Sequence, residues 1–317
     1  MIAAGPSPTG ALACSEAQSA VWTPAELTAA AAEAVPLGPE RVGRCGRLAL
    51  AFAPAGGTTR LVCGFATAPF VVPRALSVDP AWPEMAVAYL VMVTGGIVQG
   101  DRLAVRVDLR SGAAVHLTTQ AATRIYRAER NCALQTIELA VDDDAYLEYW
   151  PDPLIPFAGA RFAQRTLLRI GRRGAIVARE VLVGGRIARG ERWQFQLYRA
   201  ETHGESLDGQ LLFRDALRLA PCDAPLARAG AFADFTVLGT AYLIGFHQPW
   251  DEVVEALDPM LRGAADVLAG VTALPAGVGV LVRILGRQTA PVLAALERVR
   301  ARTRQSFGLP PAVPLRK

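Results

Sequence analysis

The sequence lacks the features by which most metal sites, redox centres and hydrolases are recognised. It has five cysteines, no two of them closer than 18 residues, so the CxxC spacing of zinc and redox motifs is absent. Its three histidines are scattered, and it contains no HExxH or GxSxG motif. An odd number of cysteines without a secretion signal predicts reduced thiols in a reducing compartment. These absences exclude the standard catalytic and soft-ligand metal motifs.

Long apolar runs and a secretory leader are also missing. The N-terminus, MIAAGPSPTG, has no basic flank before an apolar core and is not typical of a secretion signal. The longest uncharged stretch, residues 85–100, is shorter than a membrane span needs and contains a Gly-Gly pair, which favours a buried strand and a turn. We therefore expect a cytoplasmic protein with no membrane partner.

Lysine is almost absent from the sequence. Lys317 is the only lysine, and arginine supplies the other cationic side chains. The net charge of +4 is modest, and the arginines are scattered singly apart from Arg172-Arg173 and a short C-terminal cluster. No basic stripe alternates with aromatic residues, as a nucleic-acid groove requires. We therefore expect no nucleic-acid partner. Arginine is instead the cation best suited to bidentate pairing at protein interfaces.

The middle of the chain alternates between apolar and polar residues. Hydrophobic residues make up 52% of the 317 residues, enough to bury a large core. The alternation runs from about Gly46 to Leu219 and predicts half-buried strands separated by Gly-rich turns. The clearest segments are residues 48–52, 103–109, 134–141 and 193–198. Because no helix-length crossover lies between them, we expect a mainly β body with antiparallel connections.

Helical periodicity begins only after this body. Apolar residues recur at helical spacing over 250–268 and again over 289–307, and a strand is predicted at 277–285 between them. We expect these two C-terminal helices to pack on the β body. The body and the helices together form a single predicted domain spanning 41–317.

The first 40 residues differ from the rest of the chain. They are rich in alanine and proline and lack a sustained apolar period, although residues 23–35 favour a short helix. We predict that 1–40 is an extension, partly disordered or docking late as an arm.

The most detailed polar pattern lies between Met85 and Arg127. An uncharged run enters a glycine turn at 95–101, an alternating strand follows, and the polar cluster Thr118-Thr119-Gln120 leads into a second turn. The first turn superficially resembles a phosphate loop, but it lacks the lysine and leads into a strand rather than a helix. We interpret it as a tight turn in which Asp101 binds local backbone amides.

Three carboxylates stand out among the other polar residues. Glu148 lies in a predicted strand, Asp152 is held between two prolines, and Glu180 interrupts a long apolar strand. A glutamate in such a strand either pairs with an arginine such as Arg161 or Arg186, or lines a wet interior path. Both interpretations stay open. One alternative function is a β-rich hydrolase that uses these carboxylates as an acid/base pair.

Several ordered segments resemble the urease accessory protein family UreD, also called UreH. The segments are 95–101, 117–127, 147–161, 179–191 and 274–286. The structural motif residues in them are Gly95, Gly96, Gly100, Arg124, Tyr126, Pro151 and Gly159. The resemblance is specific because all these segments occur in order at matching spacing, and it covers the chain from about Gly43 to its C-terminus.

The resemblance implies a non-enzymatic urease maturation scaffold with a β-rich, helix-supported fold. It also implies binding to apo-urease and to UreF-type and UreG-type accessory proteins, with Ni²⁺ passing through an internal tunnel. No tightly bound cofactor is expected, because transit favours weak oxygen ligands over a closed soft-ligand site. The candidate path residues are Asp101, Thr118, Thr119, Gln120 and Glu180. A rival hypothesis is a pure assembly scaffold that holds urease open and carries no metal.

Overall fold

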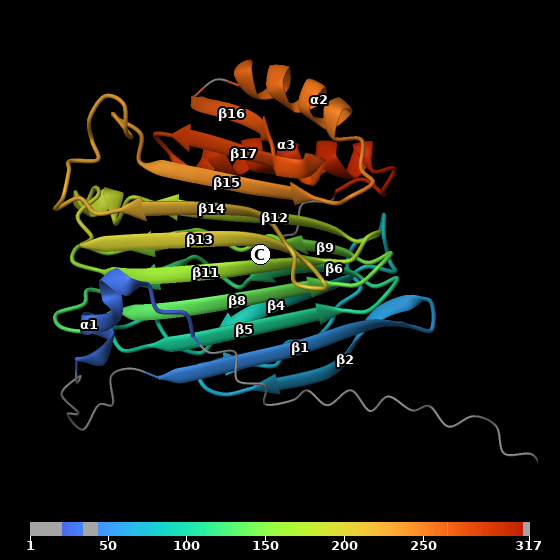
Figure 1. Cartoon of the computed structure of the whole chain (residues 1–317), viewed down its shortest axis with the longest axis horizontal. Coiled ribbons are helices and arrows are strands. Elements are labelled where there is room, and N and C mark those ends of the chain that lie inside the picture. Colours follow the sequence, from blue (N-terminus) through green and yellow to red (C-terminus); the bar gives the residue numbers. More distant parts are fainter. Residues whose placement is uncertain (1–20, 34–43, 265, 313–317) are drawn as a thin grey trace, which may run out of the picture.

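The structure is a computed structural model that describes residues 21–33, 44–264 and 266–312. Two β-sheets lie face to face, and two C-terminal helices cover the far side of one of them (Figure 1). The prediction of a mainly β body supporting two C-terminal helices is confirmed.

One sheet has seven strands and lies nearest the viewer in Figure 1. In spatial order they are β14 (Leu211–Leu219), β13 (Leu197–Ser206), β11 (Arg161–Ile170), β8 (Ala133–Val141), β5 (Arg102–Leu109), β1 (Cys45–Ala55) and β2 (Thr58–Ala66).

The other sheet has ten strands. Eight follow one path: β16 (Val267–Ala273), β17 (Gly279–Gly286), β15 (Val237–Ile244), β12 (Ala175–Val183), β9 (Tyr146–Tyr149), β6 (Ala114–Thr119), β4 (Ala86–Met92) and β3 (Phe70–Val71). The short strands β10 (Leu154–Pro156) and β7 (Thr123–Ile125) branch from β12.

The prediction of antiparallel connections is wrong for the centre of both sheets. From β4 to β13 the long strands alternate between the sheets, so each strand returns beside the previous strand of its own sheet and parallel to it. Antiparallel pairs occur toward the sheet edges, as in β1–β2 and β13–β14. Parallel pairing needs a long crossover, and a strand of the opposite sheet supplies it here in place of a helix.

The C-terminal part follows the predicted helices with one correction. Helix α2 spans Trp250–Arg262 and α3 spans Thr289–Ser306. The first predicted helix was too long, because the chain turns after Arg262 and Leu268 belongs to edge strand β16, whose residues alternate in exposure. A single-turn helix, η3 (Pro275–Gly277), precedes β17.

The predicted strand at 193–198 is only partly formed. Leu197 and Tyr198 belong to β13, but Trp193 has a φ of 53° and lies in the loop after η2 (Ile187–Arg189). Its ring packs on Phe232 at 4.4 Å between ring centroids. The buried aromatic residues of this loop continue the apolar–polar alternation of β13, which explains why the sequence predicts a strand that begins at Trp193.

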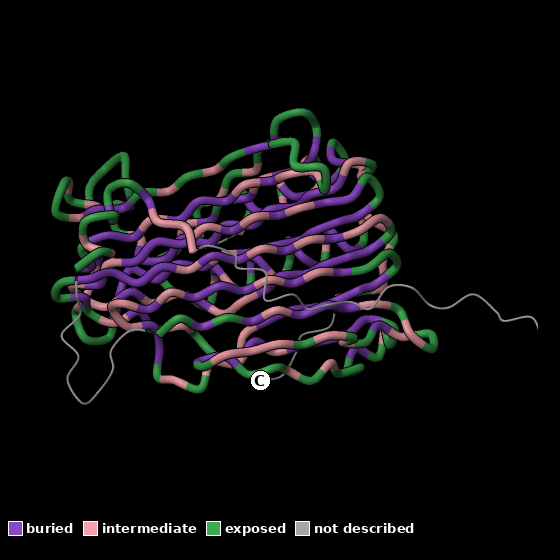
Figure 2. The backbone as a smooth tube through the Cα atoms, turned by 60° about the horizontal axis from the view of Figure 1, so that its bottom comes forward, coloured by how far each residue is buried: buried purple, intermediate pink, exposed green. Residues whose placement is uncertain are grey.

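Two core layers result from these elements. One lies between the sheets, and the other lies between the ten-stranded sheet and helices α2 and α3. Buried residues follow the strands while exposed ones gather at the loops (Figure 2). Each central strand of the ten-stranded sheet therefore presents one face to each layer.

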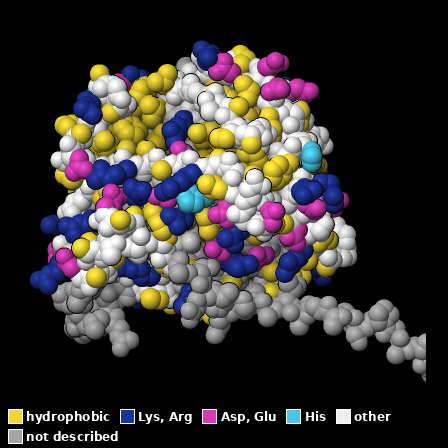
Figure 3. Space-filling model, viewed as in Figure 1, with side chains coloured by type: hydrophobic (Ala, Val, Ile, Leu, Met, Phe, Trp, Pro, Cys, Tyr) yellow, Lys and Arg dark blue, Asp and Glu magenta, His cyan; other side chains and the backbone are white. Residues whose placement is uncertain are grey.

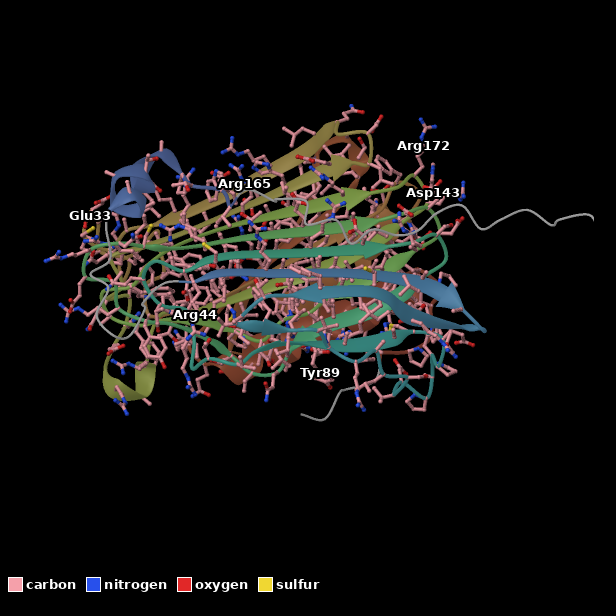
Figure 4. The ribbon with its side chains drawn as sticks, turned by 90° about the horizontal axis from the view of Figure 1, so that it is seen from below. Glu33, Arg44, Tyr89, Asp143, Arg165 and Arg172 are labelled. Atoms are coloured by element: carbon pink, nitrogen blue, oxygen red, sulfur yellow. The ribbon has the colours of Figure 1, made fainter. Side chains whose placement is uncertain are left out.

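The described part of the N-terminal extension packs on the outer face of the seven-stranded sheet. It contains η1 (Ala25–Leu27) and α1 (Thr28–Ala32), which confirms the predicted short helix. Trp22 lies 4.2 Å from the guanidinium of Arg165, which Figure 4 labels on the face that carries α1. Arginine and acidic side chains alternate across this face in Figure 3. The predicted disorder of 1–20 and 34–40 lies outside the described residues.

Two further sequence predictions concern thiols and membranes. Cys45, Cys132 and Cys222 are free, but Cys63 is disulfide-bonded, so the prediction of reduced thiols is wrong at that position. In the ranges that the structure describes, no helix is both long and apolar enough to cross a bilayer.

Candidate functional site

The two turns that were singled out in the sequence lie against each other. The amide of Ile97 donates to the carbonyl of Arg124 at 2.8 Å, and the amide of Tyr126 donates to the carbonyl of Ile97 at 2.8 Å. Gly96 has a φ of 151°, and a Cβ there would lie 2.5 Å from the Arg124 carbonyl oxygen. Glycine is therefore required at this close approach. Gly95 accepts a hydrogen bond from the Tyr126 hydroxyl at 3.3 Å.

The remaining motif residues also fix the backbone near these turns. Gly100 has a φ of 83° and donates its amide to the Cys132 carbonyl at 2.9 Å. Gly159 has a φ of 76° and carries the side chain of Arg127 against it. The carbonyl of Pro151 accepts from Arg179 at 3.0 Å. Four of the seven motif residues, Gly95, Gly96, Arg124 and Pro151, line the rim of an internal cavity.

A cavity of about 270 Å³ opens at this rim and extends between the two sheets. Its rim includes Thr94, Gly95, Gly96 and residues 120–124. Deeper polar groups come from both sheets. They are Thr119, Gln135, Tyr149, Asp152, Gln164, Thr166, Arg179, Glu180, Thr202 and Tyr242. Oxygen atoms are therefore the main potential cation ligands of the cavity wall.

Glu180 on β12 and Asp152 are the two carboxylates that the described residues contribute to this cavity. The Glu180 side chain accepts hydrogen bonds from the Tyr198 hydroxyl and from Gln164, both at 2.7 Å. Arg161 and Arg186 contact other partners, so neither of them neutralises it. Of the two interpretations left open by the sequence, lining an interior path fits this placement.

The pKa of Glu180 is raised above its ordinary value. Burial is the largest cause, and the charge of Asp215 adds to it, while the hydrogen bonds from Tyr198 and Gln164 oppose it. A carboxylate with no buried cation beside it gains stability from protonation or from a positively charged visitor.

Two other predicted path residues line the same cavity, and two do not. Thr119 and Gln120 lie on its wall, and Thr119 accepts the amide of Asp152 at 2.8 Å. Thr118 points to the helix side of the sheet and donates to the Trp150 carbonyl at 2.8 Å. Adjacent residues of a strand face opposite sides, so Thr118 and Thr119 cannot share one site.

Asp101 is also away from the cavity wall. Its carboxylate accepts the amides of Arg44 and Val98, each at 2.9 Å, as the turn interpretation predicted. Burial raises its pKa, while those two backbone hydrogen bonds oppose the rise. The geometry therefore assigns Asp101 to holding the turn.

Sequence reasoning missed the polar residues of β11 and β13. Gln164 and Thr166 alternate with Arg165 on β11, and Thr202 on β13 pairs with Thr166. Polar residues at i and i+2 of a strand indicate that one face of the strand is polar. The sequence alone does not show whether that face points into the protein or toward solvent.

Glu148 lies on the opposite face of the sheet from Glu180. It is fully buried and accepts hydrogen bonds from His116 at 2.6 Å, from Tyr146 at 2.9 Å and from Arg300 at 3.1 Å. Arg304 adds bonds of 2.5 and 2.9 Å. Although burial alone raises the pKa of Glu148, these partners hold it well below its ordinary value.

This placement rules out one form of the hydrolase hypothesis. Glu148 and Glu180 are separated by the sheet itself, so they cannot act on one substrate as an acid/base pair. Burial also lowers the pKa of His116, while its hydrogen bond to Glu148 and the charge of Glu148 oppose that shift.

The fold and the site define a double-sheet protein with a glycine turn at the mouth of an internal cavity whose polar wall is mainly oxygen atoms. Comparison with known proteins identifies its family. The model of the UreD urease accessory protein family matches residues 44–317, and the chain belongs to that family. Members of this family are urease accessory proteins involved in maturation and not enzymes.

Individual relatives support the assignment over most of the chain. A urease accessory protein UreD 2 of Streptomyces griseus is 37% identical over 285 residues, which cover 89% of this chain and 96% of the relative. A UreD 2 of Brucella canis is 34% identical over 75% of this chain and 80% of its own length. A UreD of Cenarchaeum symbiosum is 31% identical over 83% and 92%.

Proposed function

We propose that this protein carries Ni²⁺ along its internal cavity to apo-urease during urease maturation in the cytoplasm. It does so in a complex with UreF-type and UreG-type accessory proteins. The nickel ion is a transient cargo, and no cofactor is tightly bound. The observation that carries this proposal is Glu180, a cavity carboxylate that forms no ion pair with any arginine among the described residues.

The chemistry of the wall suits transit rather than storage. Carboxylate, amide and hydroxyl oxygens bind nickel less strongly than imidazole or thiolate groups. A path must release what it takes up, so weak ligands at several positions favour movement. Thr119 and Gln120 near the rim and Glu180 deeper in the cavity supply such positions.

The test is a Glu180→Ala variant co-expressed with urease and the other accessory proteins. We expect urease to remain folded but to contain several-fold less nickel, while the variant still co-purifies with its partners. Glu205→Ala is the matched control, because Glu205 forms an ion pair with Arg169 on the outer side of the seven-stranded sheet. The control should leave the nickel content unchanged.

Two outcomes would contradict this proposal. Wild-type nickel content with Glu180→Ala would favour the assembly scaffold that carries no metal. Equal losses of nickel content, partner binding and melting temperature would assign Glu180 to structure. Nickel content is measured on purified urease, so the result does not depend on urease activity alone.

A further inference from the structure

A row of polar residues crosses the inner face of the seven-stranded sheet. The strand register places Thr166 beside Thr202, and Thr202 beside Asp215, across β11, β13 and β14. Thr166 and Thr202 line the cavity. Asp215 accepts the hydroxyl of Tyr242 from the opposite sheet at 2.7 Å, so it too faces inward. The row leads from the cavity to the edge strand β14.

A second row lies opposite the first on the ten-stranded sheet. The register places Glu180 beside Thr240, and Thr240 beside Arg283, across β12, β15 and β17. Thr240 is buried, and Arg283 reaches across to Asp215 on the other sheet. Side chains at directly paired positions share a face of the sheet, so the row is continuous. The two rows form a polar strip through an otherwise apolar core.

The strip ends where Asp215 meets Arg283. One guanidinium nitrogen lies 2.6 and 2.7 Å from the two carboxylate oxygens. The Asp215 side chain is 20% exposed and that of Arg283 is 45% exposed, so solvent reaches this end. The charge of Asp215 also contributes to the raised pKa of Glu180, which places the two carboxylates within electrostatic range.

Among the described residues, no further strand of the seven-stranded sheet lies beyond β14 at this end. That sheet stops at β14, whereas the other continues through β17 to β16, as Figure 1 shows above β14. Arg283 therefore places its positive charge at the β14 edge, where solvent reaches the ion pair with Asp215. A partly exposed ion pair is only weakly held, so it opens without unfolding the sheets.

We propose that Asp215 and Arg283 close a second opening of the cavity, and that a divalent cation passes there by replacing the guanidinium on Asp215. The inference rests on the proposed function and names where the path leaves the protein. Glu180 and Asp215 are then successive oxygen ligands, linked by neutral hydroxyl groups. Arg283 keeps Asp215 neutralised while no metal is present.

Accessibility of the strip tests the opening itself. The thiol introduced by Thr202→Cys reacts with a small cationic methanethiosulfonate, and peptide mapping by mass spectrometry reports the rate at that position. Adding Arg283→Gln should raise the rate several-fold. Arg287→Gln is the matched control, because Arg287 pairs with Asp234 in an exposed ion pair at the start of the loop after β17. The control should leave the rate unchanged. An unchanged rate with Arg283→Gln, in a variant that melts like the parent, overturns the proposal.

Nickel transfer tests the second part. In the complex with urease and its accessory proteins, Asp215→Asn should lower urease nickel content several-fold, as Glu180→Ala does. If Glu180→Ala lowers nickel content but Asp215→Asn does not, the cavity carries nickel and the exit proposed here is wrong. If neither lowers it, the proposed function itself fails. Melting curves of both variants separate these results from a loss of folding.

Discussion

The ten-stranded sheet carries the buried Glu148 on one face and the half-buried Glu180 on the other, and their surroundings differ. Glu148 meets two arginines, a histidine and a tyrosine beneath helix α3. Glu180, facing the other sheet, receives only the neutral donors Tyr198 and Gln164 and borders a cavity. The pKa is lowered for Glu148 and raised for Glu180.

The difference shows that one sheet can carry a carboxylate with a structural role on one face and a carboxylate without an ion pair on the other. A buried charge must be balanced, and the balance is permanent when it comes from side chains of the same chain. Glu148 is balanced in this way and fastens α3 to the sheet. In the part of the chain that the structure describes, Glu180 has no such cation, so its charge can be balanced by water, a proton or a passing metal ion. Four predictions test this contrast.

The largest effect is expected for Glu148→Ala. The substitution leaves Arg300 and Arg304 buried without their shared carboxylate, which should cost about 3–5 kcal/mol of the free energy of unfolding. Chemical denaturation measures this loss. Glu205→Ala, which removes a surface ion pair, should change the stability by less than about 1 kcal/mol. A loss of similar size at both positions would show that the buried cluster does not stabilise the packing of α3 on the sheet.

Asp101→Ala should have an intermediate effect on stability. The side chain satisfies two backbone amides at the glycine turn, and losing it leaves donors that cost about 1–3 kcal/mol when buried. Asp101→Asn retains an acceptor and should recover part of the loss. If Asp101→Ala instead lowers urease nickel content at unchanged melting temperature, Asp101 belongs with Glu180 and not with Glu148.

Glu180→Gln should alter stability by no more than about 1 kcal/mol, because no cation depends on this carboxylate. Urease nickel content should nevertheless fall, since the amide cannot supply a negative ligand. Denaturation of the purified variant and metal analysis of co-expressed urease give the two values. A loss comparable to that of Glu148→Ala would remove the contrast between the two faces.

The smallest effect is the pH dependence of stability, whose sign should differ between the two glutamates. The lowered pKa of Glu148 means that its stabilising charge is fully present above the ordinary pKa of 4.5 and is lost as the pH falls below it. The raised pKa of Glu180 means that its charge costs stability above the raised value, and this cost disappears on acidification. Relative to Gln variants, wild type should therefore gain stability with rising pH at position 148 and lose it at 180.

Much of the fold could be predicted because local pattern and burial agree. Residues 103–109 and 134–141 lie in strands as expected, and α3 covers most of 289–307. Pairing direction could not be predicted, because alternation in one strand carries no information about which strand lies beside it. The polar strip could not be predicted either, because its residues come from six strands whose pairing the sequence does not show.

Three of the five candidate path residues lie together in the structure. Thr119, Gln120 and Glu180 meet in one cavity, although 60 residues separate the last two in the chain. Thr118 and Asp101 do not line this cavity, because strand alternation and turn geometry direct their side chains elsewhere. Glu148 could not be distinguished from Glu180 by sequence, because its partners Arg300 and Arg304 come from a distant helix.

The sequence by itself determined the family, the β-rich class, the glycine turns and the absence of closely spaced metal-binding motifs, because these depend on residue identity and short spacing. Tertiary structure decided that Glu148 is held by arginine side chains and that Glu180 faces the cavity with neutral hydrogen-bond donors only. That decision depends on the face of the strand and on the cations within reach, and both are set by how two sheets and one helix pack together.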